Sequence, residues 1–160
     1  MTHLKSTAVG LALAAALTLP TAARATTVAL PSATEQTELL SIFTTADRLH
    51  DECENALEVQ DDSSIGAYCT MSAQQYGRSA IKLLKYPQLT SDWRTFRFLM
   101  ASDLLHAAEA RSRYNRPQAF SQATSALAIL KDLANRGETN LDSAIFVARR
   151  IIRECDATRN

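Results

Sequence analysis

The chain has 160 residues, of which 46% are hydrophobic and 21% are charged, and this composition is typical of one globular domain with a packed core. Its 17 basic and 17 acidic residues give a formal net charge of zero, which argues against a nucleic-acid binder that neutralises phosphates. Four glycines and four prolines supply too few turn residues for a fold of many short strands.

The first 25 residues have the three-part pattern of a secretory signal peptide. Lys5 supplies the positive start, and the apolar stretch over 8–19 is too short to span a bilayer, which needs about 20 residues. Small residues at 23 and 25 predict cleavage after Ala25. We therefore expect a periplasmic or secreted protein whose mature chain has no membrane span.

Residues 26–31 form a short leader, and a single helical domain is predicted over 32–160. Ser32 and Glu35 fit a capping box, so the first helix is expected to begin there and to run to about Glu58. The polar turn at 61–64 precedes a second helix over about 65–86. Apolar residues step by three and four along both segments, as on one helix face. The two stripes are Ile42, Ala46, Leu49, Cys53 and Ala56, then Cys69, Ala73, Tyr76, Ala80 and Leu83.

Three more helices are predicted: one over about 90–114, one from 116 that stops at Gly137, and one that starts near Asn140. The aromatic first half of the third is expected to be central in the core. Asn115 is the predicted N-cap of the fourth, and so short a link makes the third and fourth helices an antiparallel hairpin. The last two stripes are Phe120, Ala123, Leu127, Leu130 and Ala134, then Leu141, Ile145, Ala148, Ile152 and Cys155. The predicted fold is all-α, an up-and-down helical bundle of about five helices, with two antiparallel hairpins plus a closing C-terminal helix.

The chain has three cysteines, and an exported protein meets an oxidising compartment in which thiols pair. Cys53 and Cys69 lie at equal distances from the turn between the first two helices, and both lie on an apolar stripe. This register predicts a Cys53–Cys69 disulfide, since bridged Cα atoms must come within about 7 Å. Cys155 is then interpreted as a small buried hydrophobe. Pairing of Cys155 with either of the other two, or with another molecule, stays open as an alternative.

Two groups of residues suggest chemistry. His50, Cys53 and Glu54 are near one another on a helix, so a metal or small-ligand carrier centred on His50 is one hypothesis, although no second pair of ligands accompanies them. Asp103 and His106 are three residues apart, so they are candidates for an oriented general base in a small helical enzyme. The simpler interpretation of both groups is an ordinary polar helix face. No motif for a cofactor is present in the sequence.

Charge is unevenly distributed along the chain. Residues 47–62 hold seven acids and one base, whereas residues 78–116 hold eight bases and three acids. Complementary packing explains such a distribution, and so does a docking surface, either an acidic one offered to a basic partner or arginines that bind an anionic one. We therefore expect an exported protein-interaction or accessory module that binds a protein of the cell envelope through Asp51, Glu52 and Glu54. The rival hypotheses are the enzyme and the carrier described above.

Overall fold

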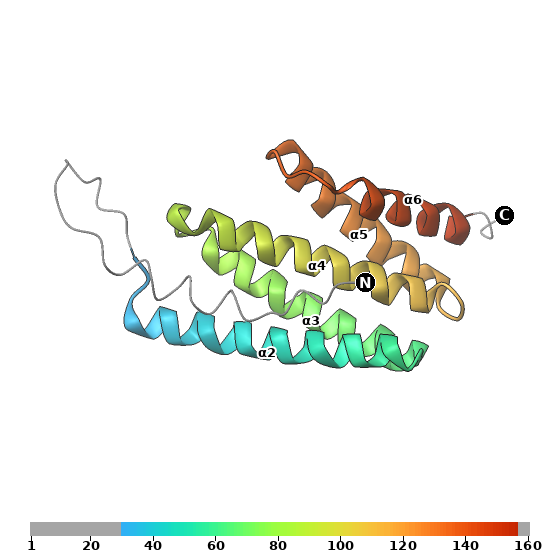
Figure 1. Ribbon diagram of the computed structural model, residues 1–160, viewed down its shortest axis with the longest axis horizontal. Coiled ribbons are helices and arrows are strands. Elements are labelled where there is room, and N and C mark those ends of the chain that lie inside the picture. Colours follow the sequence, from blue (N-terminus) through green and yellow to red (C-terminus); the bar gives the residue numbers. More distant parts are fainter. Residues whose placement is uncertain (1–29, 157–160) are drawn as a thin grey trace. The chain divides into compact units, whose positions relative to one another are not determined.

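The computed structural model describes residues 30–156, and the described part of the chain contains helices and no strand (Figure 1). The predicted signal peptide and most of the leader lie outside these residues. The long helices are α2 (Ala33–Glu58), α3 (Asp62–Leu83), α4 (Thr90–Arg111), α5 (Arg116–Asn135) and α6 (Asp142–Asp156). A short 3-10 turn, η2 (Pro87–Leu89), leads into α4. The predicted all-α, up-and-down bundle of five helices is confirmed.

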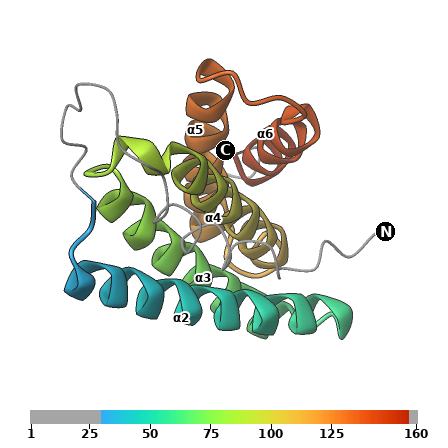
Figure 2. The ribbon, with the colours of Figure 1, turned by 60° about the vertical axis from the view of Figure 1, so that its left-hand side comes forward.

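Each helix packs mainly against the next one along the chain. Figure 2 shows α3 and α4 between α2 on one side and the α5–α6 pair on the other. Because α2, α3 and α4 alternate in direction, the first turns of α4 lie at the end of the bundle where α2 begins. No helix within residues 30–156 combines the length and the apolar character that crossing a bilayer requires.

Side-chain caps define three of the helix starts. Ser32 Oγ accepts a hydrogen bond from the Glu35 backbone N–H, and Glu35 Oε2 accepts one from the Ser32 N–H at 2.9 Å, which completes the predicted capping box. The Glu35 carboxylate accepts hydrogen bonds from the Ser32 backbone N–H, the Ser32 hydroxyl and Tyr86, and these lower the pKa of Glu35 to about 2. Asp61 caps α3 through the N–H groups of residues 63 and 64, and Asn115 caps α5 as predicted.

The core consists largely of small side chains. Two clusters of buried residues flank α4, which contributes alanines to both. The disulfide cluster comprises Cys53, Ala56, Ile65, Cys69, Ala107 and Ala110. The Cys155 cluster comprises Ala108, Ala119, Ala123, Ile151 and Cys155.

The expectation that the aromatic first half of α4 is central in the core is only partly correct. Trp93 and Phe96 are buried, but Phe98 is 43% exposed, and the second half of the helix is in contact with the core on two sides.

Candidate functional site

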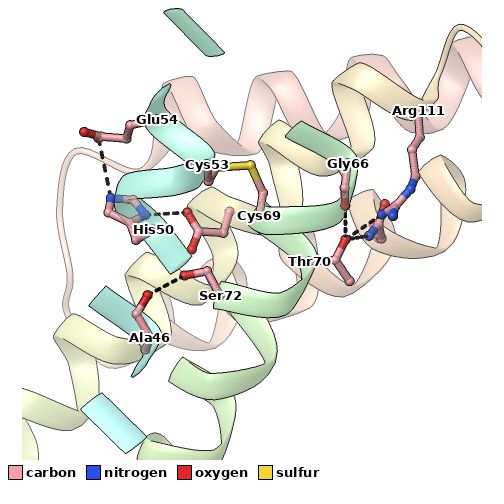
Figure 3. The surroundings of a disulfide bond; sticks show 11 residues. Ala46, His50, Cys53, Glu54, Gly66, Cys69, Thr70, Ser72 and Arg111 are labelled. Atoms are coloured by element: carbon pink, nitrogen blue, oxygen red, sulfur yellow. Dashed lines mark hydrogen bonds and ion pairs between the residues drawn. A yellow bond between two sulfur atoms is a disulfide. The ribbon is translucent and has the colours of Figure 1, made fainter. Parts of the chain in front are cut away.

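The disulfide joins α2 to α3 at the end of the bundle where these helices turn (Figure 3). Cys53 and Cys69 have Cα atoms 4.9 Å apart, within the range that a bridge requires. The structure therefore has the pairing that the helical register predicts. Cys155 is buried and is not part of a disulfide, and burial raises the pKa of its thiol. These properties agree with the interpretation of Cys155 as a small core residue.

One turn before Cys53, the imidazole of His50 extends from α2 to a buried carboxylate on α4. His50 Nδ1 lies 2.8 Å from Asp103 Oδ1, and the Asp103 side chain is fully buried. The other ring nitrogen, Nε2, lies 3.5 Å from the exposed carboxylate of Glu54 (Figure 3). The hydrogen bond to Asp103 raises the pKa of His50, while burial opposes this rise and the charges of Asp103, Glu54 and Asp51 add to it.

Tyr76 of α3 completes the surroundings of this pair. Its ring meets the His50 ring edge-on at a centroid distance of 6.1 Å and stacks on Phe96 at 5.9 Å. Burial raises the pKa of Tyr76 far above its usual range, so the phenol stays protonated. Within the described protein, neither the Tyr76 hydroxyl nor Asp103 Oδ2 has a hydrogen-bond partner. The arrangement therefore places an imidazole, a carboxyl group and a phenol between three helices.

The two candidate residues Asp103 and His106 are not hydrogen-bonded to each other in the described part of the chain. Asp103 is fully buried and is paired with His50 of α2, because α2 and α4 both pack on α3, while His106 lies one turn further along α4. His106 instead lines a hollow of about 200 Å³ together with Glu109, Arg113 and Asp62. Burial lowers the pKa of His106, and Arg113 is paired with Asp62 at 2.7 Å. The general base proposed from the sequence is therefore not assembled.

The metal site hypothesised around His50 also lacks the ligands that it would need. Cys53 is in the disulfide, and His50 Nδ1 is used by Asp103. In the part of the chain that the structure describes, no group of three histidine, cysteine or acidic side chains converges in a way that could hold a metal ion. The Asp103 carboxylate orients the His50 imidazole, as carboxylates do in catalytic dyads and metal sites, but the hollow beside His106 does not include this pair.

A polar junction that the sequence analysis missed connects three helices near the disulfide. Thr70 of α3 donates to the Gly66 carbonyl and accepts hydrogen bonds from Arg111 Nη1 of α4 and Gln122 Nε2 of α5, the latter at 2.8 Å (Figure 3). Arg111 at the end of α4 and a threonine in mid-helix look like surface residues in the sequence. Only the packing of α3, α4 and α5 brings them together.

Several of the basic side chains of residues 78–116 form ion pairs within the domain. Lys82 pairs with Glu38, Arg94 with Glu138, Arg97 with Asp132 and Arg113 with Asp62. This part of the charge pattern is therefore explained by complementary packing.

The acidic side chains of α2 differ from these basic ones. Asp47, Asp51, Glu54 and Glu58 are spaced by four, three and four residues, so they lie along one side of the helix. We call these four residues the acidic face. Asp51, Glu54 and Glu58 are exposed. In the described structure no lysine or arginine forms an ion pair with any of these three, and Arg48 forms none either. Glu52 is half-buried and lies off this face.

A larger hollow lies at the opposite end of the bundle, between the first turns of α4 and the connection from α5 to α6. Its volume is about 680 Å³, and its lining includes the exposed ring of Phe98 and the Arg94–Glu138 ion pair. No sequence motif marks it, because its two walls come from segments that are far apart in the chain.

Comparison with known protein families, with curated proteins and with solved structures finds no match for this chain.

Proposed function

We propose that this chain is an exported helical binding module that docks on a basic protein partner through the acidic face of α2. The observation that carries the proposal is a row of exposed carboxylates on α2, at Asp51, Glu54 and Glu58, with which no lysine or arginine within residues 30–156 forms an ion pair. Acidic residues spaced by four on a helix repel each other by a few tenths of a kcal/mol per pair. Glu54 and Glu58 have this spacing, and Asp51 lies three residues before Glu54 on the same side of the helix.

The position of the acidic face adds a second cost. Glu54 and Glu58 lie near the C-terminal end of α2, where the helix dipole favours positive charge, and the last turn of α2 has no basic residue. Sequences that depart from local rules without a structural benefit tend to do so at functional positions. A basic partner would turn both costs into favourable contacts.

The buried side of α2, opposite the acidic face, is fixed to the rest of the domain, and this suits a docking surface. Cys53 lies on the opposite, buried side of the same helix turns, and its bond to Cys69 holds this end of α2 against α3. A rigid surface loses less conformational entropy when a partner binds. A disulfide also agrees with an oxidising compartment, which supports the export that the N-terminal segment predicts.

The docking test compares charge changes on and off the acidic face. One variant carries Asp51→Asn, Glu54→Gln and Glu58→Gln. Its control carries Ser121→Lys, Thr124→Lys and Ala128→Lys on the exposed side of α5, which changes the net charge by the same amount. Immobilised wild-type and control proteins are expected to retain the same envelope protein, with at least a tenfold loss in the neutralised variant and weakening by salt. Equal retention by all three proteins, or no salt-sensitive partner, would overturn the proposal.

Export has its own test. The full chain, expressed in a Gram-negative host, is expected in the periplasmic fraction with an intact mass that corresponds to residues 26–160 and to one disulfide. Recovery of the unprocessed chain in the cytoplasmic fraction would contradict the export proposal and leave the docking test unaffected.

A further inference from the structure

The hollow between α4 and the α5–α6 connection has the dimensions of a small-molecule site. Its volume of about 680 Å³ falls within the range of about 300–1,000 Å³ that is typical of such sites. Leu133 and Leu141 contribute buried apolar surface to it, and Phe98 contributes an aromatic ring that is 43% exposed. A large exposed aromatic side chain in a concavity offers a flat apolar surface to a ligand.

Hydroxyl and amide groups make up much of the remaining lining. Thr90 and Thr95 donate their hydroxyl protons to the helix carbonyls of Pro87 and Ser91. Each threonine oxygen therefore keeps acceptor capacity for a ligand. Asn140, whose backbone is in the left-handed region at φ 62°, adds an amide side chain that both donates and accepts.

The charged groups of this hollow neutralise each other. Arg94 Nη1 lies 3.0 Å from Glu138 Oε1, and Arg94 Nη2 donates to the Arg136 carbonyl at 3.1 Å. This arrangement fixes the α5–α6 connection against α4 and leaves no excess charge from the pair. Arg94 Nε is buried and has no acceptor within residues 30–156, so one donor of this lining residue is unused.

We propose that this hollow binds a neutral saccharide of one to three rings. A sugar ring has an apolar C–H side and a rim of hydroxyl groups that both donate and accept hydrogen bonds. Phe98 matches the first feature, and the hydroxyl, amide, guanidinium and carboxylate groups around it match the second. This inference is independent of the proposed docking function, because the acidic face lies at the other end of the bundle.

Other classes of ligand fit less well. An anion would have to compete with Glu138 for Arg94, and a cation would have to compete with Arg94 for Glu138. An extended peptide is usually bound by the free edge of a strand, and the walls here are helices whose backbone groups bond internally. A helical peptide needs a continuous apolar groove, whereas hydroxyl, amide and charged side chains interrupt the apolar surface here.

The test uses the full mature protein, labelled with ¹⁵N, and three neutral trisaccharides: maltotriose, cellotriose and triacetylchitotriose. At least one is expected to shift the backbone amide signals of residues 90–98 and 138–141 while those of 47–58 stay in place. Phe98→Ala is expected to weaken that binding at least tenfold. The matched control is Phe146→Ala, because Phe146 is an equally large and more exposed ring (63%) on α6 outside the hollow.

Thr139→Lys serves as a second variant, because it blocks the exposed rim of the hollow without removing a core group. It is expected to abolish the shifts while the far-UV circular dichroism stays unchanged. The proposal is overturned if none of the three sugars shifts these signals at about 10 mM, well above the millimolar range of weak binding. It is also overturned if Phe146→Ala and Phe98→Ala weaken binding equally, or if glucosamine or glucuronate oligomers bind more tightly than the neutral sugars.

Discussion

The two buried clusters on either side of α4 show two ways to stabilise a core made of small residues. The disulfide cluster packs three alanines and Ile65 around a covalent bond between α2 and α3. The Cys155 cluster connects α4, α5 and α6 through three fully buried alanines and Ile151, with no covalent bond. Alanine allows close helix approach but buries little area, and stabilisation scales at about 25 cal/mol per Å². The stability of the disulfide cluster is therefore expected to depend on the covalent bond. The stability of the Cys155 cluster is expected to depend on how closely its helices fit together.

The largest expected effect is the loss of the disulfide. The double variant Cys53→Ser, Cys69→Ser is expected to lose about 3 kcal/mol of unfolding free energy, the value for a loop of about 15 residues. Chemical denaturation with and without a reductant measures this loss. The reductant is expected to destabilise the wild type and to leave the double variant unchanged. A reductant effect of equal size in both proteins would contradict this assignment.

The next effect concerns the close fit of the Cys155 cluster. Ala123 is fully buried there, and Ala123→Leu is expected to cost about 1–3 kcal/mol because the helices would have to move apart. The exposed position Thr124 provides the control, since Thr124→Leu on the same helix is expected to change the free energy of unfolding by less than about 0.5 kcal/mol. Equal effects of both changes, measured in urea, would show that this side of α4 is loosely packed.

The pH dependence of stability distinguishes His50 from His106. The pKa of His50 is raised above 6.5 in the folded state, so its contribution is complete below pH 6.5 and is lost as the pH rises through the folded value. The pKa of His106 is lowered from 6.5, so its contribution is present above pH 6.5 and is lost as the pH falls. The two effects oppose each other in the wild type.

Single variants therefore separate them. Across neutral pH, the unfolding free energy of His50→Gln is expected to rise with pH because only His106 remains, and that of His106→Gln is expected to fall. Urea unfolding at a series of pH values from about 5 to about 8 measures both slopes. Slopes of the same sign in the two variants would exclude the assigned His50–Asp103 pair as the cause.

The smallest expected effect is at Gly77, in the middle of α3. A Cβ atom placed there lies 3.2 Å from Met100 Sδ and 3.3 Å from its Cε, which is the flexible end of a side chain. Gly77→Ala is expected to gain helix stability of about 1 kcal/mol, less the cost of a small movement of Met100. A net increase in the denaturation midpoint checks this, and a clear decrease would show that α3 and α4 need the glycine for their approach.

Helix positions and end caps were predictable because they depend on neighbouring residues. The capping box at Ser32 and Glu35 and the Asn115 cap are present as predicted. The second helix was expected at about 65–86 and lies at Asp62–Leu83, because Asp61 caps it earlier than the apolar stripe indicates. Terminal turns are set by caps and local bends, which the spacing of apolar residues does not record.

The disulfide was predictable for a related reason, since a short turn between two helices determines which residues face each other. The hydrogen-bond partner of Asp103 could not be predicted in this way. Spacing along α4 favoured His106, yet His50, 53 residues away, is the partner, because α2 and α4 both pack on α3 and this brings His50 within hydrogen-bond distance of Asp103. Side chains three apart on a helix are neighbours, but a buried carboxylate takes the donor that packing places within hydrogen-bond distance.

The amino-acid sequence alone was sufficient for the helical class, the order of the five long helices and the Cys53–Cys69 bond, all of which follow from local periodicity and from the symmetry of a hairpin. Tertiary packing alone decided the His50–Asp103 pair, the Thr70 junction and the hollow lined by Phe98. These features join residues from helices that are distant in the chain, and their contacts depend on how the helices rotate and lie against each other. Small core residues leave that rotation weakly specified by the hydrophobic pattern, so it becomes evident only in the folded protein.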